Sequence, residues 1–77
     1  MKRVKLNKKW NIINEKGTYL SEFWFDFASE FRGDLAYVKR SNKYNFIKKD
    51  GTYLSKIWFD YVWCFRDDFA IVELNTK

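Results

Sequence analysis

Side chains that commonly perform covalent or acid–base chemistry are scarce in this chain. Cys64 is the only cysteine and there is no histidine, so no imidazole is present to activate the thiol as a nucleophile. The same counts exclude a disulfide and a four-ligand zinc site within one chain. Asp26 and Asp60 each follow an aromatic run, and we interpret both as turn residues whose carboxylates accept backbone N–H bonds. We therefore expect no catalytic residue, no metal site and no cofactor.

Basic residues are the second group of side chains that could have a function. They give the chain a formal net charge of +5. This balance favours acidic partners such as nucleic acid. A dense cluster surrounds the middle of the chain and comprises Lys39, Arg40, Lys43, Lys48 and Lys49. Two interpretations are open: a footprint for nucleic-acid phosphates or another acidic surface, and a lysine-guarded sheet edge that resists aggregation.

An internal repeat must position these groups. Residues 9–43 and 43–77 align at an offset of 34, with 17 identical pairs in 35 positions, which is too many for chance. The strand-like run at Val4 aligns in turn with the runs at Val38 and Val72. We therefore divide the single domain, residues 1–77, into a strand copy at 1–8, repeat one at 9–42 and repeat two at 43–77.

Both repeats are predicted to form β-structure. Residues 35–40 and 43–48 are rich in β-favouring residues with a period of two, and Ser41-Asn42 between them predicts a hairpin turn. Gly17 and Gly51 predict a second turn with positive φ, followed in each repeat by a short strand at "YLS". The next segment predicts an extended run that ends in a compact turn near residues 29–34.

The run "KKWNIINEKGTYLSEFWFDFASEFRGDLAYVK" is similar to the WG repeat, a unit of about thirty-five residues common in bacterial proteins. The resemblance covers essentially the whole chain, and it implies tandem antiparallel β units that bind rather than catalyse. Trp10-Asn11 and Tyr44-Asn45 replace the Trp-Gly pair, and we expect these asparagines to keep the positive φ of glycine. The acidic-glycine turn of the family is altered to Gly33-Asp34 and Asp67-Asp68.

The sequence predicts an all-β fold, a small antiparallel repeat sheet built from two 34-residue repeats plus an extra strand. Two repeats and a fraction are too few for an open solenoid, because repeat arrays need about three units to bury their apolar faces. Three arrangements are open. The end strands pair and close the sheet into a barrel-like roll, the chain dimerises, or a partner covers one face.

Trp63-Cys64 is the most informative difference between the repeats, because it places apolar bulk where repeat one has Ser29-Glu30. Trp is enriched at interface hot spots, so we predict that Trp63 and Cys64 bind a partner. The alternative is that Trp63 enlarges the core. Arg32 and Arg66 recur where the resemblance implies a small polar residue, and arginine suits planar bidentate contacts. Both join the predicted partner-binding set.

The leading hypothesis is a small non-catalytic protein that occupies a surface of a larger protein or ribonucleoprotein that handles nucleic acid. In size and character it is similar to the inhibitors that phages and mobile elements encode, anti-CRISPR proteins among them. Direct binding of RNA or single-stranded DNA is one alternative, and a self-associating structural module, such as a homodimer, is another. We expect a cytoplasmic protein without a membrane segment, because a lone thiol stays reduced there and no run approaches roughly 20 apolar residues.

Overall fold

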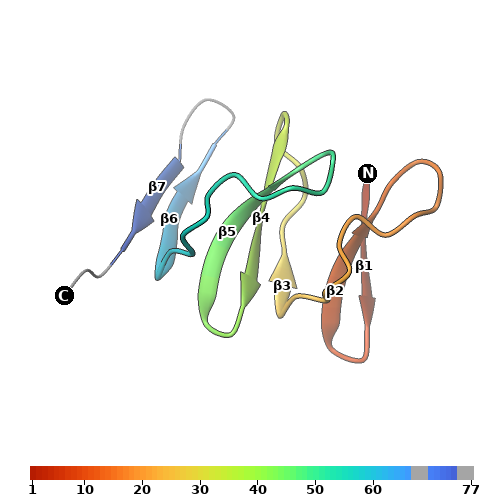
Figure 1. Cartoon of the computed structure of the whole chain (residues 1–77), viewed down its shortest axis with the longest axis horizontal. Coiled ribbons are helices and arrows are strands. Elements are labelled where there is room, and N and C mark those ends of the chain that lie inside the picture. Colours follow the sequence, from red (N-terminus) through yellow and green to blue (C-terminus); the bar gives the residue numbers. More distant parts are fainter. Residues whose placement is uncertain (67–69, 75–77) are drawn as a thin grey trace.

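The computed structural model describes residues 1–66 and 70–74, and within them it is all β, as predicted (Figure 1). Seven short strands alternate with turns and two long connections. The strands are β1 (Lys2–Leu6), β2 (Lys9–Ile13), β3 (Phe27–Ala28), β4 (Leu35–Arg40), β5 (Lys43–Lys48), β6 (Tyr61–Phe65) and β7 (Ala70–Glu73).

The strands form three small antiparallel sheets, β1-β2, β3-β4-β5 and β6-β7. At the repeat offset of 34, β1 and β2 correspond to β4 and β5, and β6 and β7 correspond to β3 and β4. The central sheet is thus a three-stranded unit, and each flanking sheet repeats two of its strands. Figure 1 shows the sheets in a row with β1 and β7 at opposite ends. The described end strands therefore do not pair, and the closed roll is not the arrangement observed.

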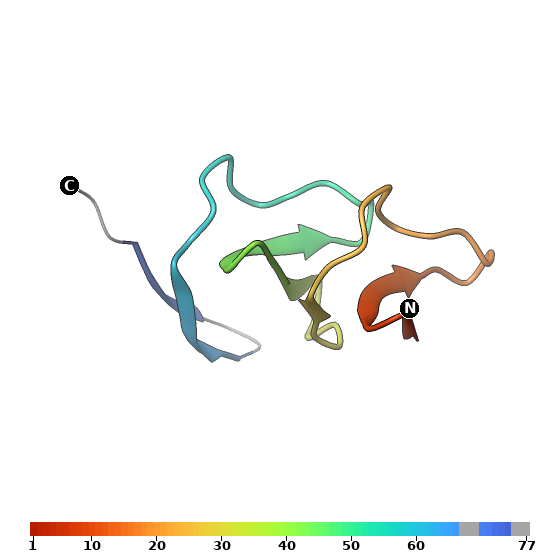
Figure 2. The same ribbon diagram turned by 90° about the horizontal axis from the view of Figure 1, so that it is seen from below.

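The two long connections, residues 14–24 and 49–58, cross the same face of the row of strands (Figure 2). The first returns to β2, where Phe25 and Trp10 exchange two backbone hydrogen bonds of 2.7 Å. The second returns to β5 in the same way through Phe59 and Tyr44, at 2.7 and 2.8 Å. The short strand predicted at "YLS" is reduced to one bridge per repeat, Ile13 with Tyr19 and Ile47 with Tyr53.

The predicted turns are confirmed where the structure describes them. Ser41 and Asn42 have φ of 53° and 65°, the paired positive values of the two-residue hairpin turn that matches strand twist. Gly17 and Gly51 have φ of 83° and 89°. The compact turn predicted near residues 29–34 closes through the Arg32 amide, which donates to the Leu35 carbonyl at 2.8 Å. The altered turn at Asp67-Asp68 lies outside the described residues.

The expectation that Asn11 and Asn45 keep a positive φ is wrong, because both lie in strands with ordinary negative φ. Their side chains are fully buried and act as ties. The Nδ2 group of Asn11 donates to the Ser21 carbonyl at 3.0 Å, and that of Asn45 donates to the Ser55 carbonyl at 2.8 Å. Each Oδ1 accepts the N–H of the next residue, at 2.8 and 2.7 Å. Each asparagine thus fastens a long connection to the strand beneath it.

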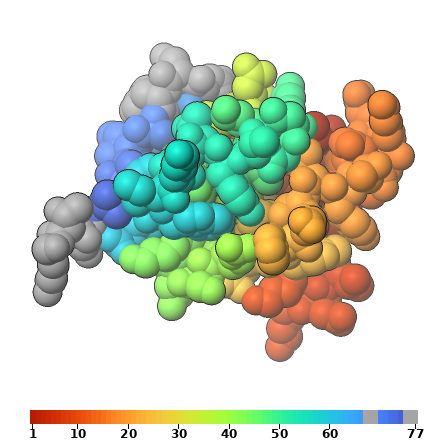
Figure 3. Space-filling view, viewed as in Figure 1, coloured from red at the N-terminus to blue at the C-terminus, as the bar shows by residue number. Residues whose placement is uncertain are grey.

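The core lies between the strands and the connections, and it belongs mainly to repeat one. Its buried residues are Ile12, Phe25, Ala28, Ala36, Val38 and Ile47, with Trp10, Leu20, Phe31, Tyr53 and Trp58 packed against them. Ile47, Tyr53 and Trp58 come from repeat two, so the second repeat completes the core of the first. Figure 3 shows the connection at residues 49–58 covering the middle of this face.

Candidate partner-binding site

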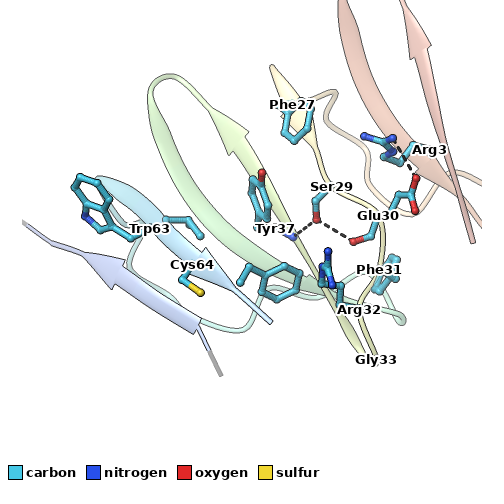
Figure 4. A pocket seen from close by; sticks show the side chains of 12 residues that line it. Arg3, Phe27, Ser29, Glu30, Phe31, Arg32, Gly33, Tyr37, Trp63 and Cys64 are labelled. Atoms are coloured by element: carbon cyan, nitrogen blue, oxygen red, sulfur yellow. Dashed lines mark hydrogen bonds and ion pairs between the residues drawn. The ribbon is translucent and has the colours of Figure 1, made fainter. Parts of the chain in front are cut away.

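A groove of about 790 Å³ lies between two segments that are equivalent in the two repeats (Figure 4). One wall is formed by residues 27–33 and the other by residues 62–65; Tyr37 lies between them, and Arg3 lies beyond the first wall beside Glu30. Ser29 and Glu30 in the first wall align with Trp63 and Cys64 in the second. The two walls of the groove thus come from equivalent segments of the two repeats, with polar residues at these two positions in the first wall and apolar residues in the second.

Ser29 ends the β3–β4 ladder on the polar wall. Its amide donates to the Tyr37 carbonyl at 2.9 Å, and its hydroxyl oxygen accepts the Tyr37 amide at 2.9 Å. The hydroxyl oxygen thus accepts the Tyr37 amide in place of a backbone carbonyl, and the pairing of β3 with β4 ends here. Beside it, Arg3 donates to the Ala28 carbonyl at 3.2 Å and pairs with Glu30 at 3.3 Å.

Trp63 occupies a β-bulge on the apolar wall. Val62 pairs with Val72 and Cys64 with Ile71, so Trp63 is the extra residue of β6, and bulges commonly re-aim a side chain. Its indole N–H donates to Glu73 Oε1 at 2.8 Å, and its ring meets that of Tyr61 edge-on at 4.8 Å. Trp63 is nevertheless 66% exposed, so it does not enlarge the core.

Cys64 is half-buried and lines the groove together with Tyr37. At the repeat offset these two residues correspond to Glu30 and Arg3, the ion pair of the preceding junction. Tyr37 packs edge-on against Phe65 with 5.7 Å between ring centroids. The charge pair of the first junction is thus absent from the second, where a half-buried cysteine stands at the position of the glutamate.

Tyr37 and Arg3 were missed as lining residues by sequence reasoning. A signal was available, because at an offset of 34 the Arg3–Glu30 pair becomes Tyr37–Cys64, so two opposite charges are lost together. Reading that signal requires knowing that Arg3 and Glu30 contact each other, which depends on how neighbouring sheets pack.

The two predicted arginines lie near each other but line different spaces. Arg32 is exposed and lines the groove, and it also lines a second hollow of about 500 Å³. Arg66 is exposed and lines only that second hollow. Of the predicted partner-binding residues, the groove thus brings together Trp63, Cys64 and Arg32, with Arg66 beside it.

The predicted basic cluster is divided between the two ends of the β4–β5 hairpin. Lys39 and Arg40 lie at one end against aromatic rings, with Lys39 Nζ 5.6 Å from the Tyr44 centroid. The Arg40 guanidinium lies 4.6 Å from the Phe23 centroid and 5.2 Å from that of Trp58. Such cation–π contacts favour the cation at the ring face.

Lys43, at the same end, forms an ion pair with Asp60. Lys48 and Lys49 lie at the far end of β5, roughly 16 Å away at about 3.3 Å per strand residue. There Lys49 Nζ lies 4.0 Å from Asp34 Oδ1. A nucleic-acid role for these five residues remains a prediction, and the hairpin does not gather them into one patch.

Asp26 caps a turn, as interpreted from the sequence. One carboxylate oxygen pairs with Lys9, and the other accepts the Ser41 amide at 3.1 Å. The hydrogen bond from Lys9, followed by that from Ser41, holds the pKa of Asp26 below its ordinary value of 3.8. Within residues 1–66 and 70–74, no group of three acidic, cysteine or histidine side chains forms a metal-binding cluster.

Comparison with known proteins identifies the family. The model described as "WG containing repeat" matches residues 12–44 and 46–77. These two consecutive matches cover most of the chain, so it belongs to the WG containing repeat family, as its sequence predicted. No curated protein and no solved structure shows significant similarity to the chain. In the part of the chain that the structure describes, no helix is long and apolar enough to cross a membrane.

Proposed function

We propose that the protein is a non-catalytic binding module that occupies a surface of a larger protein or ribonucleoprotein partner. The contact surface is the groove between residues 27–33 and 62–65, with Trp63 at its apolar wall. The observation that carries the proposal is that Trp63 is 66% exposed although a bulge, the Tyr61 ring and Glu73 all fix its position.

A tryptophan held in this way suits recognition. Large exposed apolar side chains commonly mark interaction sites, and a side chain that is already ordered loses little conformational entropy on binding. Phe27, Tyr37 and Phe65 line the groove together with Arg32, and aromatic residues and arginine are the types enriched at protein interfaces. The groove thus combines an apolar anchor with an exposed cation.

A protein surface fits these observations better than direct nucleic-acid binding. Lys39 and Arg40 lie against aromatic rings, and Lys43 is paired with Asp60. A partner that handles nucleic acid still agrees with the net charge of +5. Inhibition by occupancy, as by anti-CRISPR proteins, is the finer form of this proposal.

The test is a double substitution that restores the residues of repeat one, Trp63→Ser with Cys64→Glu. The partner is first captured from a bacterial lysate and identified, and its affinity for each variant is then measured by calorimetry. We expect folding to persist and binding to weaken by about 2 kcal/mol or more, the size of a hot-spot loss. Inhibition of the partner's activity should weaken in parallel.

The matched control is Ile57→Ser, because Ile57 is also strongly exposed, at 57%, but lies outside the groove. This variant should bind the partner as the parent does. Equal losses in the control and the double variant would contradict the proposal. So would a double variant that unfolds while its folded fraction keeps full affinity.

A further inference from the structure

Arg32 is a charged residue of the groove for which the described residues provide no acidic partner. Of the residues that line the groove, Arg3, Glu30 and Arg32 are charged. Arg3 and Glu30 form an ion pair at 3.3 Å. Within residues 1–66 and 70–74, the carboxylates that form ion pairs bind other cations, and none pairs with the Arg32 guanidinium. Figure 4 shows the Arg32 side chain projecting into the space between the two walls, where it is accessible to a ligand.

The second wall does not neutralise this cation. Its residues, 62–65, are Val, Trp, Cys and Phe, so the wall has no charged side chain. Cys64 stands where repeat one has Glu30, and the carboxylate that pairs with Arg3 therefore has no counterpart in this wall. Glu73 of the adjacent strand lies outside the lining, and its Oε1 accepts the Trp63 indole N–H at 2.8 Å. The groove thus combines an unmatched positive charge with an apolar wall.

These two properties define the chemistry of a complementary ligand. The planar guanidinium of arginine matches a carboxylate in a bidentate, charge-assisted pair. Phe27, Tyr37 and Phe65 line the same groove and offer apolar surface to an uncharged side chain. A segment that carries a carboxylate close to an aromatic or large aliphatic side chain satisfies both properties at once.

We propose that the groove binds an acidic segment of the partner protein, with a carboxylate on Arg32 and a large apolar side chain against the wall at residues 62–65. The inference rests on the proposed function and names the chemistry of the partner segment. The formal net charge of +5 attracts such a segment over a longer range, while the groove selects the carboxylate that lies next to an apolar side chain.

The arrangement of the aromatic rings favours a protein segment over single-stranded nucleic acid. Single strands bind where successive bases stack on ring faces along a positively charged track. Here Tyr37 meets Phe65 at an interplanar angle of 84°, and Tyr61 meets Trp63 at 71°, so these rings do not present a row of parallel faces. One unpaired guanidinium in the lining matches one carboxylate better than it matches a run of phosphates.

The probe is a capped synthetic peptide with one phenylalanine between two pairs of aspartates. It is titrated into the intact protein at low salt and followed by NMR. We expect saturable binding with a dissociation constant on the order of 100 µM. The shifts should centre on residues 30–33 and 62–65 and on the Nε–H signal of Arg32. A lack of saturation below about 1 mM, or shifts that lie elsewhere, overturns the inference.

Two altered peptides test the two halves of this chemistry. One has asparagines in place of the aspartates, and the other has serine in place of the phenylalanine. Each should bind at least about tenfold more weakly, because one lacks the carboxylates and the other lacks the apolar side chain. An asparagine peptide that binds as tightly as the parent would refute recognition of a carboxylate. Tighter binding of oligothymidylate at the same residues would also overturn the inference, in favour of nucleic acid.

The protein variant that tests the inference is Arg32→Gln, and Arg66→Gln is its matched control. Arg66 is the equivalent residue of repeat two, is also exposed, and does not line the groove. Arg32→Gln should weaken the peptide at least about tenfold, whereas Arg66→Gln should weaken it less than about twofold, the effect of a screened charge. Folding should persist, because the turn at Arg32 closes through its backbone amide. Equal losses in the two variants would overturn the inference.

Partner capture separates this inference from the proposed function. Capture that is lost on the double substitution of Trp63 and Cys64 but withstands Arg32→Gln would show that the groove binds its partner without a carboxylate, and the inference alone would fail. Capture that withstands the double substitution, in a protein whose peptide binding depends on Arg32, would refute the proposed function while the acidic-peptide site stands. Loss of capture in both variants, with Arg66→Gln unchanged, is the result that we expect.

Discussion

Single residues show which parts of the repeat are fixed and which differ. Asn11 and Asn45 tie their connections to their strands with bonds that agree within 0.2 Å between repeats, at 3.0 and 2.8 Å. Ser29 and Trp63 occupy equivalent positions yet do opposite things, since one ends a ladder and the other bulges out of a longer strand. Internal ties are thus duplicated, while the difference between the repeats lies at the groove.

Replacing Asn45 with Ala should destabilise the protein strongly. The change removes the donor to the Ser55 carbonyl and the acceptor of the Phe46 amide, at a fully buried position. Buried polar groups left without partners cost about 1–3 kcal/mol each, so we expect a loss of about 2–4 kcal/mol in the free energy of unfolding. Urea denaturation followed by circular dichroism measures it.

Ser55→Ala is the control for this prediction, because the carbonyl that Asn45 binds belongs to the backbone and survives the change. It should cost clearly less, since only the bond from the Ile57 amide to the Ser55 hydroxyl, at 3.1 Å, is lost. If Asn45→Ala cost no more than Ser55→Ala, the asparagine would not be a tie.

Structural elements were predictable from the sequence where their conformation depends only on residues close to them along the chain. Ser41-Asn42 and the two glycine turns were identified because positive φ demands particular residue types. The path of the connections was not, because Asn11 acts on Ser21 across a crossing that no local pattern reveals. The bulge at Trp63 also depends on pairing with β7. Sequence reasoning therefore named Trp63, Cys64 and Arg32, whereas the rest of the wall at residues 27–33 and the lining by Tyr37 and Arg3 required the structure.

The two long connections meet at Gly51, and this contact distinguishes two otherwise equivalent glycines. A Cβ at Gly51 would lie 2.6 Å from the Leu20 carbonyl oxygen, whereas one at Gly17 would have nothing within 4 Å. Both have positive φ, which costs an L-residue roughly 1–2 kcal/mol. Gly51→Ala should therefore lower the free energy of unfolding by about 1–3 kcal/mol more than Gly17→Ala, the usual range for overpacking.

Thermal and urea denaturation of the two alanine variants measure that difference. Gly17→Ala serves as the control for the backbone term, because it shares the left-handed conformation without the clash. Equal stabilities would mean that the connections separate readily at this point and do not pack as one layer.

The whole molecule is a row of three sheets measuring 40 × 28 × 18 Å. Polar contacts at the strand ends connect neighbouring sheets. Asp26 makes one such contact, because its carboxylate binds both Lys9 of β2 and the turn between β4 and β5. Lys43 and Asp60 form the equivalent ion pair one repeat later. Stability of the assembly is thus linked to the ionisation of an aspartate between units.

Acid should weaken the contacts of Asp26 over a defined pH range. The pKa of Asp26 is lower in the folded protein than its ordinary value of 3.8, so its contribution is fully present above pH 3.8 and is lost as the pH falls through the folded value. Asp26→Asn should lower the melting temperature at pH 5, and its deficit relative to the parent should shrink at pH 2. Melting curves across this range measure the effect.

Glu22→Gln is the control, because it removes one negative charge from an exposed residue and matches the change in net charge. Its melting temperature should track that of the parent across the same range. A constant difference between Asp26→Asn and the parent at every pH would contradict the assignment.

The uneven burial of the four tryptophans has a spectroscopic consequence. Trp10, Trp24 and Trp58 are half-buried, whereas Trp63 stands 66% exposed on the end hairpin. Indole emission shifts to longer wavelength in water, so the red edge of the spectrum is dominated by Trp63 and the blue edge by the other three. The intrinsic fluorescence of this protein therefore reports two events separately. Emission at the blue edge changes when the core unfolds, and emission at the red edge changes when a ligand covers the groove.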